Sequence, residues 1–371
     1  MVVAVAVVQG WGLTGLSGYD PVVRICLITN QELDTVPFPA NDWPCDPRPF
    51  LPDDEWHLLT LEDKYTSAAE VERQIKRGFD LFFNLCDGAE GQDIPGIEVI
   101  HTLERHGVPF TGATSSFYEP TRIEMKAACA SVGVASPACV LARTEEDVER
   151  AAQTLRFPLF VKHYNSYASV DLSRNSRVRT PEGLRLQARK IMSRHGATLI
   201  EEYIEGLECA VLVAENPEDL SNPKTYTPIQ YRFPKGESFK HAKLKWEDYD
   251  GLECIPVADP VLSSRLRHEA AQFFVALGGT SFGRCDVRVD AAGIPYMLEI
   301  NPNCGVYFPP SDPGTADIIL AHDPAGHAGF TRQLVAAAFA RHAPSSAPLR
   351  PNLCYSPARA PVAHPDRAPV S

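Results

Sequence analysis

Apolar and polar positions follow two different periods along the first third of the chain. Apolar runs at residues 3–8 and 22–28 predict strands that are buried on both faces, and residues 80–85 and 108–111 also have a strand pattern. Residues 67–77 and 95–106 have the periodicity of surface helices. Because strands alternate with helices, we expect βαβ units and a parallel sheet. The first domain is therefore expected to be α/β and to span residues 1–120.

The rest of the chain predicts two further units and a tail. Apolar periodicity predicts helices at residues 121–131, 181–195 and 262–277. Strands are expected at residues 159–162, 198–204, 209–214 and 227–232, followed by a hairpin over residues 281–301. The change to a strand-rich pattern divides this part into units at residues 121–205 and 206–342. Residues 343–371 contain seven prolines and almost no apolar periodicity, which predicts a disordered tail.

The hairpin carries the strongest chemical pattern in the chain. Its first strand alternates apolar residues with charged ones, which therefore share a face: Arg284, Asp286, Arg288 and Asp290. On the return strand, one face is expected to hold Met297, Glu299 and Asn301. Carboxylate and amide side chains that can bind cations are thus concentrated on a single hairpin, together with two arginines.

A register for this hairpin follows from its loop. We expect Val289 to pair near Ile294. This register places Arg284 opposite Glu299, with Asp286 one step away on the diagonal. Two carboxylates and an amide oxygen then converge, and these are the hard oxygen ligands that Mg²⁺ takes. The same pattern also fits a solvated face with cross-strand ion pairs, and the alternation alone leaves both interpretations open.

Composition limits the partners and the compartment. The chain has 371 residues and a formal net charge of −12, which argues against nucleic acid or an anionic membrane as a partner. No apolar run reaches the roughly 18 residues that a membrane span needs. The ten cysteines have no C-x-x-C spacing. We therefore expect neither a disulfide framework nor a structural zinc site, and a reducing cytoplasm fits the chain best.

Six short elements match one known family in order and spacing. They are F-N-L at 83–85, M-K at 125–126, F-P-L-F-V-K at 157–162, E-E-Y-I-E-G-L-E at 201–208, F-K-H-A-K-L-K-W at 239–246, and G-R-C-D at 283–286 with E-I-N-P-N-C-G at 299–305. Together they resemble the ATP-grasp ligases, in particular the D-alanine–D-alanine ligase-like branch. The resemblance implies a three-domain ATP-grasp architecture of α/β and α+β class. ATP is expected between the central subdomain (121–205) and the C-terminal subdomain (206–342).

The resemblance also implies roles for individual residues. The implied ligands of one or two Mg²⁺ ions, for which Mn²⁺ can substitute, are Asp286, Glu299 and Asn301. The implied ATP contacts are Lys126, Lys162, Ser169, Glu201, Glu202, Ile204, Glu208 and Lys245. Among them the lysines neutralise phosphate, and Lys245 is favoured over Lys243. Glu201 accepts from the adenine amino group and Glu208 bonds the ribose. Arg284 and the amide of Gly305 are implied to stabilise an oxyanion in catalysis, together with the charge of Lys245.

The implied reaction joins a small carboxylate to a small amine, both of amino-acid type, through an acyl phosphate. Three departures from the family bear on it. The phosphate-covering loop at residues 165–172 contains no glycine, so we expect Ser169 to make the phosphate contact. Asp87 stands where the relatives have a histidine, and prolines interrupt the segment 307–312, where they have a substrate-binding serine. Two D-alanines are therefore not the expected substrates, and a homodimer is left open.

Two alternatives to a ligase remain. The glycine-free loop is compatible with an ATP-grasp-like protein that binds nucleotide without ligation, although the retained site residues argue against it. A literal G-x-G-x-x-G at residues 10–15 also invites an NAD(P)-dependent oxidoreductase. That motif needs a helix after its third glycine, and Asp20 and Pro21 leave no room for one before the next strand.

Overall fold

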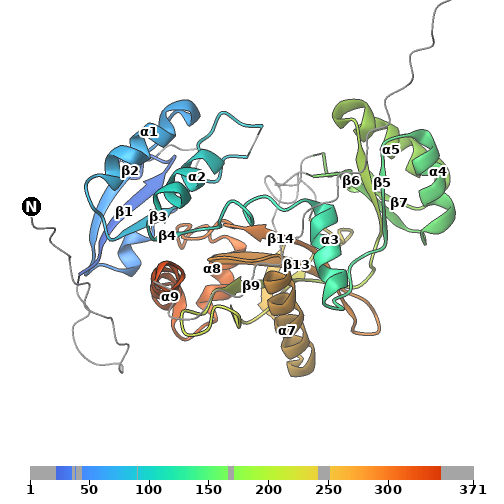
Figure 1. Cartoon of the computed structure of the whole chain (residues 1–371). Helices are drawn as coiled ribbons and strands as arrows, with labels where there is room; N and C mark the ends of the chain where they lie inside the picture. Colours follow the sequence, from blue (N-terminus) through green and yellow to red (C-terminus); the bar gives the residue numbers. More distant parts are fainter. Residues whose placement is uncertain are drawn as a thin grey trace, which may run out of the picture.

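The computed structural model describes residues 22–35, 38, 44–89, 91–165, 171–240 and 251–343. Within these ranges the chain forms three β-sheets. In Figure 1 the blue N-terminal part and the green central part lie on opposite sides of the orange and brown C-terminal sheet. None of the helices in the described ranges combines the length and the apolar composition that crossing a membrane requires. The predicted strand at 3–8, the motif at 10–15 and the tail from residue 344 lie outside these ranges.

The N-terminal sheet is parallel, as the alternation of strands and helices predicts. Its strand order is β2-β1-β3-β4. Its elements are β1 (Arg24–Thr29), η1 (Arg48–Phe50), β2 (Glu55–Thr60), α1 (Lys64–Ile75), β3 (Leu81–Asn84), α2 (Ile97–His106) and β4 (Phe110–Thr111). The sequence pattern does not predict β2, because this edge strand is only partly buried and has Glu55 and His57 among its first three residues.

The central sheet is antiparallel and has a core of its own. Its strand order is β5-β8-β6-β7. Its elements are β5 (Cys139–Ala142), α4 (Glu145–Thr154), β6 (Leu159–His163), η2 (Arg174–Ser176), β7 (Arg177–Val178), α5 (Pro181–His195) and β8 (Thr198–Glu202). Helix α5 has the predicted bounds, because Thr180 caps its start and Gly196 ends it in a left-handed conformation. The apolar pattern does not predict helix α4, because this helix buries only Val148 and Ala151.

The C-terminal sheet carries helices on both faces. Its order is β12-β11-β9-β13-β14, with β10 beside β9. Its elements are β9 (Leu207–Ala214), β10 (Lys224–Thr225), β11 (Ile229–Arg232), β12 (Glu253–Pro256), α7 (Pro260–Ala276), β13 (Phe282–Val289), β14 (Pro295–Pro302), α8 (Thr315–Ala321) and α9 (Gly326–His342). Helix α7 packs on the face that contains Val287. Helices α8 and α9 pack near Phe282 on the other face, whose remaining half presents Arg284 and Asp286.

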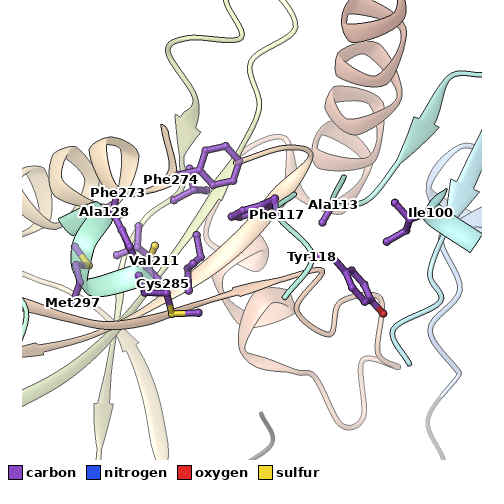
Figure 2. Close-up of a cluster of buried hydrophobic side chains, with 14 of the residues drawn as sticks. Ile100, Ala113, Phe117, Tyr118, Ala128, Val211, Phe273, Phe274, Cys285 and Met297 are labelled. Carbon is purple, nitrogen blue, oxygen red and sulfur yellow. The ribbon is translucent and has the colours of Figure 1, made fainter. Parts of the chain in front are cut away.

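Two apolar clusters join the N-terminal and C-terminal sheets, and Phe117 lies in the core that the first of them forms. Figure 2 shows Phe117 between Phe274 of α7 and Ala113, and the Phe117 and Phe274 ring centroids are 5.3 Å apart. Helix α3 (Arg122–Ser131) also belongs to this core, since Met125 packs there and the helix contacts α7 and β14. The start of the segment 121–205 is thus held by the C-terminal sheet. The boundaries at 120, 205 and 342 stay predictions.

Candidate active site

The β13–β14 hairpin brings the two candidate metal-binding carboxylates directly opposite each other. Asp286 pairs with Glu299, and Arg284 pairs with Asn301. The expected register, with Arg284 opposite Glu299, is wrong by two residues. All four side chains nevertheless share one face of the hairpin, as a two-residue shift allows.

A β-bulge explains part of the difference. At the turn, Val289 pairs with Pro295, one residue further along than expected. Leu298 is then an extra residue, because Val287 pairs with Met297 while the preceding residue pairs with Glu299. Met297 consequently lies on the apolar face with Val287 and is 1% exposed. Its expected place beside Glu299 is wrong, since alternation alone cannot reveal a bulge.

Each of the two candidate metal-binding carboxylates is paired with an arginine. Arg284 donates two parallel hydrogen bonds to Asp286, of 2.8 and 2.9 Å, and Arg122 forms an ion pair with Glu299. Asn301 donates its Nδ2 to Asp286 at 3.0 Å, which leaves its amide oxygen available to a cation. The side chains of Asp286 and Glu299 are 21% and 24% exposed. Both carboxylates are therefore accessible to a ligand.

Arg122 is a site residue that the sequence reasoning missed. It is the first residue of α3, after Thr121, whose capping box with Glu124 fixes the helix start. The motifs indicate Lys126, one turn later, and not Arg122. The spacing of four residues could have indicated Arg122 as well, because residues four apart lie on the same side of a helix.

Lys126 and Lys162 meet at one buried carboxylate, that of Glu201, and we call these three residues the lysine cluster. Each ammonium nitrogen lies 2.6 Å from a different oxygen of Glu201. Glu201 is 2% and Lys162 is 6% exposed. Burial raises the pKa of Glu201, but the two ammonium groups outweigh it and lower this pKa to about 2. Burial, with a contribution from Arg122, lowers the pKa of Lys162 to about 8.

The other predicted nucleotide contacts lie beyond this cluster. Glu202 pairs with Arg156, whose side chain is 81% exposed. The carbonyl of Ile204 and the carboxylate of Glu208 both accept from Arg288, each at 2.9 Å. Burial raises the pKa of Glu208, although Arg288 acts in the opposite direction. Ser169, Lys243 and Lys245 lie outside the described residues.

Gly305 is exposed and lies against an aromatic ring. A Cβ at this position would lie 2.6 Å from Cε2 of Phe308, so the close approach requires glycine. Tyr307 does not line the site. It is 3% exposed, and its hydroxyl lies 3.0 Å from that of Thr331 in the core. Tyr307 is therefore a core residue, and it does not shape a substrate pocket as an aromatic residue in this segment could.

The donor set on the hairpin suits Mg²⁺. Within the described ranges, no three His, Cys, Asp or Glu side chains gather as a complete metal cage would require. Mg²⁺ needs fewer protein ligands, because it is commonly held by one or two carboxylates while phosphates and water complete its octahedral shell. Asp286, Glu299 and the amide oxygen of Asn301 match that requirement.

Comparison with known proteins identifies the family. The family model described as "D-ala D-ala ligase C-terminus" matches residues 131–307, which include Lys162, Glu201 and the hairpin. A D-alanine–D-alanine ligase from Xanthomonas axonopodis pv. citri is 30% identical over 239 residues, covering 62% of this chain and 71% of the relative. The chain belongs to the D-alanine–D-alanine ligase family. The resemblance seen in the motifs is thereby confirmed.

Solved structures named as ligases of this kind share the fold. The D-alanine–D-alanine ligase of Bacillus anthracis, in a complex with ATP, superposes with a TM-score of 0.61 at 16% identity, covering 86% of this chain and 99% of that one. The VanG D-Ala:D-Ser ligase of Enterococcus faecalis gives a TM-score of 0.62 at 15% identity, with coverages of 86% and 100%. The expected mixed α/β fold of ATP-grasp type, with a parallel N-terminal sheet, is confirmed.

Proposed function

We propose that this chain joins a carboxylate to an amine in an ATP-driven reaction, using the hairpin and the lysine cluster. As a member of the D-alanine–D-alanine ligase family it is an ATP-dependent, ADP-forming ligase that makes carbon–nitrogen bonds. This membership favours neither the oxidoreductase nor the non-ligating alternative. The observation that carries the residue assignments is the pairing of Asp286 with Glu299, each paired with an arginine.

The reaction has two steps. First, a carboxylate oxygen of one substrate attacks the γ-phosphorus of ATP, and the bond from phosphorus to ADP breaks. Second, the amine nitrogen attacks the carbonyl carbon of the acyl phosphate, the amine loses a proton, and the carbon–oxygen bond to phosphate breaks. The products are an amide, ADP and phosphate. Both steps develop negative charge on oxygen, so the protein acts by positioning and by neutralising charge.

We assign the oxyanion to Arg284 and to the backbone N–H of Gly305. Arg284 uses Nε and one terminal nitrogen to hold Asp286. In the part of the chain that the structure describes, its Nη1 has no hydrogen-bond partner and is left for the oxyanion. A guanidinium fixed by one carboxylate is a preorganised donor, which is the arrangement that stabilises a developing charge most effectively.

We assign a metal role to Asp286, Glu299 and Asn301, for one or two Mg²⁺ ions that Mn²⁺ can replace. When bound, the metal neutralises charge on the terminal phosphates of ATP. Arg122, which pairs with Glu299 in the structure, would contact a phosphate oxygen if Glu299 held the metal instead. In this proposal Arg122, which the sequence motifs do not indicate, also takes part in binding ATP.

We assign the nucleotide to the lysine cluster and to the segment that follows β8. Lys126 and Lys162 neutralise phosphate, and Glu201 holds both lysines while it accepts a hydrogen bond from adenine with a remaining lone pair.

The remaining contacts come from outside the cluster. Glu202 and Ile204 make backbone or apolar contacts to the base, and Glu208 contacts the ribose. Lys245 and Ser169 make further phosphate contacts.

We infer that the two substrates are amino acids or similar molecules other than a D-alanine pair. Asp87 replaces the histidine that the family resemblance expects after the F-N-L motif. An acidic side chain there favours a cationic group on the substrate, such as an ammonium. A cytoplasmic location, a homodimer and the absence of nucleic-acid or membrane partners stay predictions.

The test is phosphate release from Mg²⁺-ATP with pooled L- and D-amino acids. We expect release that depends on a pool and that is lost in Asp286→Asn. Splitting the active pool then identifies the substrates. Release that persists unchanged in the variant would contradict the metal assignment. If no pool gives release although ATP stabilises the chain against thermal unfolding, the ligation proposal fails for amino acids.

A further inference from the structure

Arg288 lies on the same face of β13 as Asp286, yet the reaction described above does not use it. Its side chain is buried, with 4% of the residue exposed. A guanidinium is always charged and carries five donors, so burying it requires several acceptors. The acceptors that surround it show what it holds in place.

Three of these acceptors are backbone carbonyls from two loops. Arg288 donates to Ile204 O at 2.9 Å, to Gly206 O at 3.2 Å and to Ser238 O at 2.7 Å. The first two belong to the connection from β8 to β9, and the third follows β11. One side chain thus ties the end of the central sheet to two parts of the C-terminal sheet.

The fourth acceptor is Glu208. Its Oε2 accepts from Arg288 at 2.9 Å. Within the described ranges the Glu208 carboxylate accepts no other hydrogen bond, so its Oε1 keeps its lone pairs for a ligand. The guanidinium also lies over the Tyr203 ring, 4.8 Å from the centroid, and the Tyr203 hydroxyl donates to the same Ser238 carbonyl at 2.9 Å. Both the carboxylate and the group that holds it are therefore fixed.

We propose that Arg288 is the positioning residue of the ribose contact: it holds Glu208 so that Oε1 faces a ribose hydroxyl of ATP. This inference rests on the proposed function, in which Glu208 bonds the ribose. Without Arg288, a carboxylate in this buried place would lose its counter-charge and either take up a proton or turn away. In both cases it would no longer accept a hydrogen bond from the sugar in the required direction.

The experiment compares the binding of Mg²⁺-ATP, 2′-deoxy-ATP and 3′-deoxy-ATP to the full chain by calorimetry. The wild type is expected to bind ATP at least about tenfold more tightly than one of the deoxy forms, as one hydrogen bond to a charged group provides. In Arg288→Met this ratio falls to within about twofold of unity. Arg288→Lys keeps the charge but not the planar fork, so it is expected to lose most of the ratio as well.

Arg177 provides a matched control. Its guanidinium lies over the same Tyr203 ring, 4.2 Å from the centroid, and it pairs with Glu205 rather than with Glu208. Arg177→Met removes a similar cation from the same ring, and we expect it to keep the wild-type ratio. Thermal unfolding verifies that each variant is folded, and the lysine variant decides the question if the methionine variant is not.

The outcomes distinguish a failure of the proposed ligase function from a failure of the positioning role of Arg288. If the wild type fails to bind ATP, the proposed function fails. If the wild type binds ATP without preferring it over either deoxy form, or if a folded Arg288 variant keeps the preference, the positioning role is contradicted while the ligase proposal stands. Loss of the preference in Arg288 variants but not in Arg177→Met supports it.

Discussion

The hairpin and the lysine cluster are both sets of opposite charges, but they differ in burial and in balance. On the hairpin, two carboxylates meet two arginines, and the carboxylate side chains are 21% and 24% exposed. In the lysine cluster, two ammonium groups share one carboxylate, and Glu201 is 2% exposed. The hairpin carboxylates are therefore accessible and balanced in charge, whereas the carboxylate of the cluster is buried and its two lysines leave one positive charge in excess.

Because of this difference, we expect the two regions to contribute differently to catalysis and to the stability of the fold. A partly exposed carboxylate can exchange its arginine for a metal ion at less cost to the fold than a buried one, because water reaches it and reduces the contribution of its ion pair to stability. A buried carboxylate that holds two ammonium groups cannot be removed without leaving charges unpaired. We therefore expect changes on the hairpin to affect catalysis first, and changes in the cluster to affect the fold as well.

The largest expected effect is on catalysis, in Asp286→Asn. If Asp286 binds the metal as proposed, its loss removes several kcal/mol of transition-state charge stabilisation, which corresponds to a rate loss on the order of 10²–10³. Phosphate release measures the rate, and thermal unfolding should show little change. A rate within a few-fold of the wild type would contradict the catalytic role of the hairpin, and with it the difference between the hairpin and the lysine cluster.

The next effect is on stability, in Glu201→Gln. This change leaves two buried ammonium groups without their carboxylate, so we expect a loss of about 3–5 kcal/mol in the free energy of unfolding. Glu299→Gln is the matched control, since the Glu299 side chain is 24% exposed and its loss leaves one guanidinium, that of Arg122, without its carboxylate rather than two ammonium groups. Denaturant unfolding compares the two, and equal losses would contradict the contrast between the two regions.

A smaller effect concerns the pH dependence of ATP binding. Because the pKa of Lys162 is lowered to about 8, its positive charge is present below pH 8 and is lost as the pH rises through that value. The protonated fraction falls by roughly eightfold between pH 7.5 and pH 9, and ATP affinity should fall by up to the same factor. In Lys162→Arg the charge persists, so calorimetry should find affinity that is flat over this range. A flat wild-type profile would contradict the phosphate role of Lys162.

The smallest effect is expected one residue away from Glu201. Glu202 pairs with a largely exposed arginine, Arg156, so Glu202→Gln should change stability by less than about 0.5 kcal/mol. ATP affinity should stay within about twofold, because the implied contribution of this residue comes from its backbone. A loss comparable to that in Glu201→Gln would show that the cluster extends further than its three residues.

Much of this arrangement could be predicted from local patterns. The parallel N-terminal sheet and the bounds of α5 follow from periodicity and capping, and Asp286 and Glu299 are recognisable from motif and alternation. The hairpin register is not, because the bulge at Leu298 adds a residue without changing the composition of the strand. Arg122 was also missed, since its partner is distant in sequence and only the packing of α3 brings them together.

The lysine cluster shows the same limit. The motifs indicate that Lys126 and Lys162 meet a phosphate and that Glu201 meets adenine, but not that the three side chains contact one another. That contact depends on α3 and two neighbouring strands, β6 and β8, meeting at one point. Residues whose role depends on several elements become apparent only when the fold is known.

The most direct test of ligation through the hairpin follows an oxygen atom. The amino-acid pool that supports phosphate release is labelled with ¹⁸O in its carboxylates, and the released phosphate is analysed by mass spectrometry. Attack of a carboxylate oxygen on the γ-phosphorus predicts one ¹⁸O in each phosphate that accompanies an amide, and none above background in Asp286→Asn. Unlabelled phosphate released together with the amide would contradict the acyl phosphate, and with it the mechanism assigned to Asp286 and Glu299.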